Sequence, residues 1–194
     1  MSLSEDLERV ARRQRVYASL REGGTKRQKE LSVLQDLLEA MTREGEPKYS
    51  APRVAEKDPP DCVAITSAGE LAAFEVTEFV SQTAVELNER ARPARGERPA
   101  IERMVMAQRS APALLDHVAE LLLRKDKRQY LGGPYAECVA LIYTDEPLLV
   151  RAQLDAWLNG HVFGPYRRLT GAYFLFNYEP NFGYPYRRLT LGGA

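Results

Sequence analysis

The sequence predicts an α/β fold in which helices flank both faces of a mixed β-sheet. Two observations predict it. Apolar runs of strand length follow one another in residues 49–77, and stretches of helical periodicity then alternate with further apolar runs. A meander of strands followed by this alternation is typical of a sheet with antiparallel and parallel neighbours. With 194 residues, 44% of them hydrophobic, we expect a single domain (residues 1–194) whose core spans about residues 25–178.

Two helices are expected before the first strand. One lies within residues 1–24, and the second begins at Thr25, where Thr25 and Gln28 have the spacing of a capping box, and runs to about Arg43. The apolar stripe of the second helix consists of Leu31, Leu34, Leu37, Leu38 and Met41. Glu30 extends this stripe toward the N-terminus, so we expect its carboxylate to reach the interior.

Three strands follow in a meander. Residues 49–55 predict a short edge strand, because Pro52 lacks the N–H that a central strand needs. CVAITS (62–67) and LAAFEVT (71–77) predict two further strands joined by a tight turn. The rest of the chain alternates: a helix from Ser110 to about Tyr130, a strand at 137–144, a helix over 145–160 and a strand at 172–178.

The hexapeptide PYRRLT occurs twice, at residues 165–170 and 185–190. Two copies are too few for a solenoid, which needs at least three stacked units. The favoured interpretation is a pair of matching surface strands. The alternative is phosphate binding by the four arginines that the copies carry, Arg167, Arg168, Arg187 and Arg188.

Composition gives little guidance about partners. The formal net charge is zero, so no global electrostatic attraction to nucleic acid or to an anionic membrane is expected. Two cysteines in apolar runs, Cys62 and Cys138, indicate buried thiols in a reducing cytoplasm. No apolar run is long enough to span a bilayer, so we expect a cytoplasmic protein without a membrane partner.

Positive charge is concentrated locally. Residues 88–100 lack apolar periodicity and predict an exposed loop, which carries Arg92, Arg95 and Arg98. RKDKR at 124–128 adds a second cluster, with Arg124 and Lys125 as further candidates for binding phosphates. The alternative for both clusters is an ordinary solvated surface.

One strand carries a carboxylate where an apolar residue would be expected. In LAAFEVT, the pleat places Glu75 and Thr77 on one face of the sheet. A buried ionised carboxylate is costly without a cation, a metal ion or water nearby. Asp61 begins the preceding strand, so a short hairpin brings it close to Glu75, and Glu30 is expected to approach from its helix. Such a group of carboxylates suits Mg²⁺ or Mn²⁺.

These residues resemble the motif of the PD-(D/E)XK, or restriction-endonuclease-like, nuclease superfamily. Pro60-Asp61 matches the PD element, Glu75-Val76-Thr77 lies at the (D/E)XK element, and the αβββαβ order of residues 25–144 matches the family core. The resemblance implies metal-dependent hydrolysis of phosphodiester bonds in nucleic acid. It also implies that Asp61 and Glu75 bind the metal, with Glu30 as a supporting ligand.

Thr77 stands where the motif has its lysine, and threonine cannot supply a positive charge. In some members of this superfamily a neighbouring helix provides the lysine, and the end of the long helix offers Lys125 and Lys127. We expect Lys127 to serve as the catalytic amine. It lies at the border of the buried stripe, whereas Lys125 is adjacent to the repulsive charge of Arg124.

The leading hypothesis is therefore a metal-dependent nuclease that uses Glu30, Asp61, Glu75 and Lys127. A second hypothesis is a non-catalytic nucleic-acid-binding or regulatory module on the same fold, and a third is a structural partner protein with no nucleic-acid role. In the plainest alternative for the motif itself, Glu75 forms a structural ion pair with an arginine and Asp61 caps a turn. The sequence leaves DNA or RNA, and monomer or homodimer, open.

Overall fold

The computed structural model describes residues 25–79, 110–144, 151–179 and 182–193. The expected helix of residues 1–24 and the arginine-rich loop of residues 88–100 lie outside these ranges. The elements, in chain order, are α3 (Lys26–Arg43), β1 (Tyr49–Val54), β2 (Cys62–Thr66), β3 (Leu71–Glu78), α5 (Ala111–Asp126), β4 (Glu137–Tyr143), α6 (Arg151–Leu158), β5 (Val162–Phe163), β6 (Gly171–Leu175), β7 (Tyr186–Arg188) and β8 (Thr190–Leu191).

Six strands form one mixed sheet in the order β1-β2-β3-β4-β6-β7. The first three strands are antiparallel neighbours, β3, β4 and β6 run parallel to one another, and β7 returns antiparallel to β6. β5 and β8 form a separate parallel pair. The prediction of an α/β fold with a mixed sheet is confirmed.

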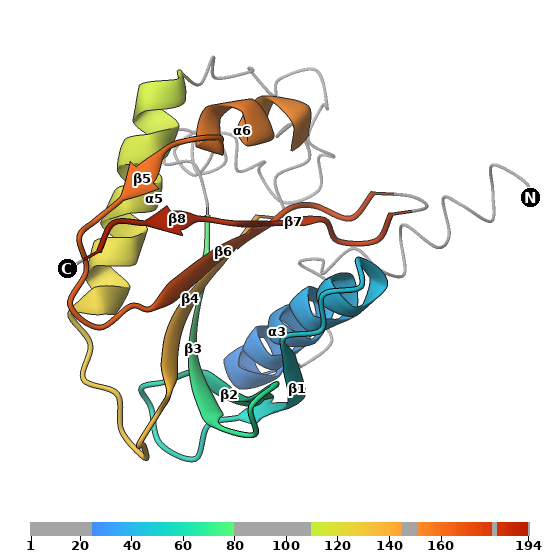
Figure 1. The fold of residues 1–194 in the computed structure, drawn as a ribbon, viewed down its shortest axis with the longest axis vertical. Coiled ribbons are helices and arrows are strands. Elements are labelled where there is room, and N and C mark those ends of the chain that lie inside the picture. Colours follow the sequence, from blue (N-terminus) through green and yellow to red (C-terminus); the bar gives the residue numbers. More distant parts are fainter. Residues whose placement is uncertain (1–24, 80–109, 145–150, 180–181, 194) are drawn as a thin grey trace, which may run out of the picture.

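Helices cover both faces of this sheet, with α3 on one side and α5 and α6 on the other (Figure 1). Alternate residues of the central strands divide between the two resulting cores. Phe74, Val76 and Leu141 pack with the apolar stripe of α3, whereas Ala140 and Ile142 pack with α5 and α6. Because successive strand residues point to opposite faces, Glu75 lies on the face covered by α5.

Local signals explain the ends of the first elements. Thr25 caps α3 as predicted, since its hydroxyl accepts the Gln28 N–H at 3.3 Å and the Gln28 side chain accepts the Thr25 N–H at 2.8 Å. β1 is the edge strand, and its register to β2 shifts between Ser50 and Arg53, on either side of Pro52. An edge position and a bulge are the two settings that tolerate proline in a strand.

The second half of the chain departs from the predictions at two points. The two PYRRLT copies do not form matching strands: the first is an irregular loop before β6, and the second contains β7. Cys62 is buried as expected, but Cys138 is partly exposed. Tertiary contacts of the two copies, described below, explain why six identical residues adopt two conformations.

No helix within the described parts of the chain is both long enough and apolar enough to cross a membrane.

Candidate functional site

The register of the β2–β3 hairpin brings Asp61 opposite Glu75. Cys62 pairs with Phe74, so the preceding residue of one strand faces the following residue of the other. The main-chain N–H of Asp61 donates to the Phe74 carbonyl at 3.1 Å, and Asp61 Oδ2 accepts the Val76 N–H at 2.8 Å. The carboxylate thus replaces a main-chain acceptor just before β2 begins, which fixes its position beside Glu75.

Lys125 reaches both carboxylates from α5. Its Nζ donates to Glu75 Oε2 at 2.8 Å and to the Val76 carbonyl at 2.9 Å, and it lies 3.5 Å from Asp61 Oδ2. An ammonium has three donors, and here three oxygens surround it. Because both carboxylate oxygens contact one nitrogen, the separation between them cannot exceed the sum of the two distances. Asp61 and Glu75 therefore converge, as the sequence predicted.

The amine at this site is Lys125 and not Lys127, which corrects the expectation from sequence. Lys125 follows Leu121 and Leu122 by four and three residues, so it continues the buried stripe of α5. Lys127 is the exposed C-cap residue of the helix and has no described contact with either carboxylate. Repulsion from Arg124 did not exclude Lys125, because Arg124 is exposed and consecutive helical side chains point in different directions.

Arg128 adds a second cation that the sequence analysis missed. Its Nη1 lies 3.4 Å from Glu75 Oε2 and 3.8 Å from Asp58 Oδ1, while 43% of the side chain is exposed. The spacing held a signal, because Arg128 follows Lys125 by three residues and therefore lies on the same side of the chain as α5 ends. Glu75 therefore pairs with an arginine, as the structural alternative expected, and it also pairs with Lys125.

Glu75 is completely buried, and this decides its electrostatics. Burial raises the pKa of the Glu75 carboxyl, against the opposing effects of the Lys125 and Arg128 cations. Glu75 Oε1 is buried and has no hydrogen-bond partner among the described residues. Buried polar atoms without a partner are rare, and a metal ion or an ordered water would satisfy this one.

Glu30 approaches the same region from α3. It lines a small pocket together with Asp58 and Asp61, and it forms an ion pair with Lys26 at 3.2 Å. Burial, followed by repulsion from Asp61, raises the pKa of the Glu30 carboxyl. The charge of Asp61 therefore acts on the Glu30 carboxyl, which reaches the interior as its place on the helix predicted.

The donor atoms fit a hard divalent cation in type. Within the described ranges, no group of three or more His, Cys, Asp or Glu residues is arranged to hold a metal ion. Mg²⁺, however, is commonly bound through one or two carboxylates together with water and substrate phosphates. Asp61, Glu75 and the Val76 carbonyl supply oxygen donors of this kind, and the partnerless Glu75 Oε1 agrees with such a use.

The predicted nucleic-acid-binding residues fall into three groups. Arg124 is exposed on α5, as surface binding requires. Lys125 is buried in the carboxylate site and does not lie on the surface, because its ammonium is taken up by the three oxygens. Arg92, Arg95 and Arg98 lie outside the described residues.

Comparison with known proteins adds no relative: no family model matches the chain, and no curated protein or solved structure matches it.

Proposed function

We propose that this protein is a metal-dependent phosphodiesterase that hydrolyses nucleic acid, on a fold like that of the PD-(D/E)XK nucleases. One observation carries the proposal: the buried ammonium of Lys125 contacts both Asp61 and Glu75. Thr77 leaves the motif without its amine, and α5 supplies one to the same two carboxylates. The α-β-β-β-α-β order of the elements described within residues 26–79 and 110–143 also supports the resemblance.

Asp61, Glu75 and the Val76 carbonyl would hold Mg²⁺ or Mn²⁺. When bound, such an ion stabilises charge on a phosphoryl oxygen and lowers the pKa of an attacking water. Lys125 would stabilise negative charge that develops on the phosphate, since its compact ammonium sits on a long stem and is already desolvated. Glu30, whose pKa is raised by burial and which lines a pocket with Asp61, would serve as a proton acceptor.

A second candidate function is a non-catalytic nucleic-acid-binding or regulatory module. One observation favours it: the charges of Asp61 and Glu75 are already balanced by Lys125 and Arg128. A divalent cation would have to compete with both of these groups for the same oxygens. In this case the four residues form a partly buried ionic cluster that joins the β2–β3 hairpin to the end of α5, and the protein binds phosphates without cutting them.

Cleavage of DNA and RNA in Mg²⁺ or Mn²⁺ separates the two functions. We expect wild type to cleave at least one substrate, and Glu75→Gln and Lys125→Met each to lose about 10²–10³ in rate. Lys57→Met is the matched control, because it removes an exposed lysine that has no described contact with Asp61 or Glu75, and it should cleave at the wild-type rate. Wild type that cleaves neither substrate with either ion would favour the binding module.

Loss of Lys125 leaves two buried carboxylates less well compensated, so the variant needs a test of folding. Thermal unfolding followed by circular dichroism should accompany each rate. Lys125→Arg keeps the positive charge and is expected to stay folded, yet its planar guanidinium cannot reproduce the three contacts of the ammonium. A folded Lys125→Met that cleaves as fast as Lys57→Met would remove Lys125 from the reaction.

A further inference from the structure

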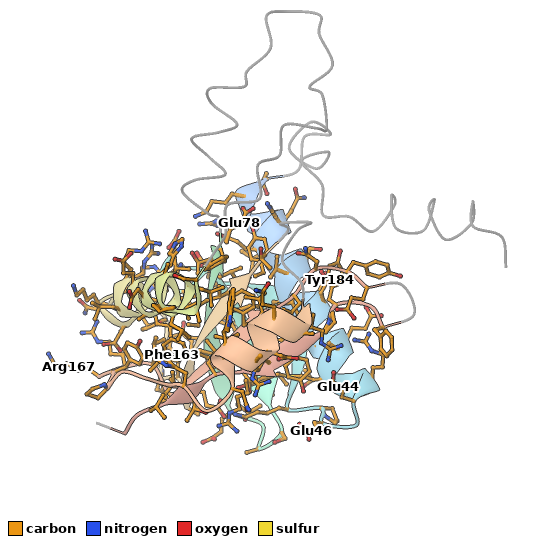
Figure 2. All side chains as sticks on the ribbon, turned by 90° about the horizontal axis from the view of Figure 1, so that it is seen from above. Glu44, Glu46, Glu78, Phe163, Arg167 and Tyr184 are labelled. Carbon is orange, nitrogen blue, oxygen red and sulfur yellow. The ribbon has the colours of Figure 1, made fainter. Side chains whose placement is uncertain are left out.

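Five basic side chains gather where α5 ends. Arg124, Lys127 and Arg128 are exposed on the last turn of the helix and just beyond it. Arg167 and Arg168 are exposed in the first PYRRLT copy, and Arg167 extends outward on the α5 side of the protein (Figure 2). We call these five residues the α5-end surface.

Hydrogen bonds hold the two halves of this surface together. The Asp126 carboxylate accepts the main-chain N–H groups of Arg167, Arg168 and Leu169, at 3.1, 2.7 and 3.0 Å. In return, Arg168 Nη1 donates to the main-chain carbonyls of Lys127 and Arg128. The arginine loop is therefore fixed against the helix, and its cations are presented without a large loss of main-chain entropy on binding.

Arg128 connects this surface to the carboxylate site. Its guanidinium contacts the buried Glu75, yet 43% of the side chain is exposed. The five cations of the surface outnumber the carboxylates beside them: Asp126 is buried under the loop, and Asp58 lies 3.8 Å from Arg128. A phosphate chain that follows the exposed cations would thus pass beside Glu75 and Lys125.

In the second PYRRLT copy, the first arginine is paired with side chains inside the protein. Arg187 donates to Asp155 at 2.8 Å and to Asn159 at 2.8 Å, so it joins β7 to α6. Arg167, the equivalent residue of the first copy, is exposed, and its main-chain N–H is the group that Asp126 holds. The same position of the repeat therefore forms internal contacts at Arg187 and is exposed to solvent at Arg167.

We propose that the α5-end surface binds the phosphate backbone of the nucleic acid and directs it to the carboxylate site. This inference rests on the proposed function and names the part of the chain that holds its substrate. Exposed lysine and arginine clusters bind phosphates by releasing counterions, so the contact is independent of base sequence and weakens with salt.

Fluorescence anisotropy tests the surface without cleavage. The probes are a fluorescein-labelled DNA duplex of mixed sequence and an RNA strand of the same sequence, both in EDTA. For the preferred probe we expect Lys127→Gln and Arg167→Gln each to lower affinity roughly fivefold to tenfold at about 0.1 M salt. Each should also reduce the slope of log K against log salt by about 1, and the double variant by about 2.

Arg188→Gln is the matched control, since it removes the same charge from an exposed arginine of the second copy. It should bind as wild type does. Equal losses in Arg188→Gln and Arg167→Gln would reduce the effect to net charge and overturn the proposal, as would wild-type affinity in Lys127→Gln and Arg167→Gln. Failure of wild type to bind either probe would overturn both proposals.

The cleavage assay separates the two failures. If the surface variants lose binding but wild type cleaves nothing, the surface stands and the hydrolase does not. If cleavage depends on Glu75 while Arg167→Gln and Lys127→Gln bind as wild type does, the hydrolase stands and the backbone runs elsewhere.

Discussion

The side chains of Asp126 and Arg168 each form hydrogen bonds with main-chain groups of the segment that carries the other residue. The carboxylate of Asp126 accepts the Arg168 N–H at 2.7 Å, and the guanidinium of Arg168 donates to carbonyls just after Asp126. Each side chain thus satisfies main-chain groups of the other's segment. The pair closes the helix end from which Lys125 projects.

Replacing Asp126 should destabilise the protein, because its carboxylate holds residues 167–169 against the end of α5. Burial acts to raise the pKa of the Asp126 carboxyl, but the main-chain hydrogen bonds from residues 167–169 outweigh it and hold the pKa below its usual value. Asp126→Ala leaves three N–H groups without their acceptor, and we expect a loss of about 2–4 kcal/mol in the free energy of unfolding. Urea unfolding of the variant beside wild type measures it.

The lowered pKa of Asp126 also determines how its contribution to the free energy of unfolding depends on pH. Because the folded-state pKa lies below the unfolded value of about 3.9, the contribution is fully present above that value and is lost as pH falls through the folded pKa. The difference in unfolding free energy between wild type and Asp126→Ala should therefore be constant near neutral pH and shrink in acid. A difference that grows as pH falls would contradict this assignment.

Glu30 should show the opposite sign. Burial and the Asp61 charge raise its pKa, so its stabilising contribution is present below the unfolded value of about 4.3 and is lost as pH rises through the folded pKa. Glu30→Gln should gain stability relative to wild type as pH rises from about 4 to 7, by less than about 1 kcal/mol because the ion pair with Lys26 offsets part of the cost of burial. Urea unfolding across this range measures the trend, which a flat or falling difference would contradict.

Arg128 should affect metal and nucleic acid in opposite directions. Its guanidinium lies 3.4 Å from Glu75 Oε2 and therefore competes with a cation for that carboxylate. Arg128→Gln should bind Mg²⁺ about threefold to tenfold more tightly in calorimetry without nucleic acid, yet bind the DNA or RNA probe more weakly. Arg124→Gln, also exposed but with no Glu75 contact in the described structure, should leave Mg²⁺ affinity unchanged. Equal Mg²⁺ affinity in both variants would show that Arg128 does not compete.

A lysine returned to the motif position should rescue the loss of Lys125. Thr77 lies two residues after Glu75 in β3 and so shares its face. Adding Thr77→Lys to Lys125→Met should therefore recover at least about tenfold of the cleavage rate, since the site regains one ammonium. The control is Thr77→Lys in wild type, where Lys125 already contacts the carboxylates and no gain is expected. If the folded double variant recovers no activity, a lysine at position 77 does not replace the ammonium of Lys125.

Local patterns predicted the parts of the fold that depend on neighbouring residues. The capping box at Thr25, the edge strand around Pro52 and the strand pleat of Glu75 all follow from a few consecutive residues. The sequence analysis placed the amine of the site at Lys127 because Arg124 was expected to repel Lys125. The position of Lys125 on the buried face of α5 is the stronger effect. The two PYRRLT copies were beyond any local rule, since Asp126 and Asp155, distant in sequence, determine what each copy does.

The parallel pairing of β3 with β4 also sets an order of events for folding. β2 and β3 meet through a short turn, but Ala72 faces Glu137, so residues 73–136 must close into a loop before β4 can join. Such high contact order is slow to form. We therefore expect the hairpin that carries Asp61 and Glu75 to form early, and the segment that carries Lys125 to join it later. The carboxylates can thus stay hydrated until their cation is at hand, and we expect substitutions at Lys125 to speed unfolding more than they slow folding.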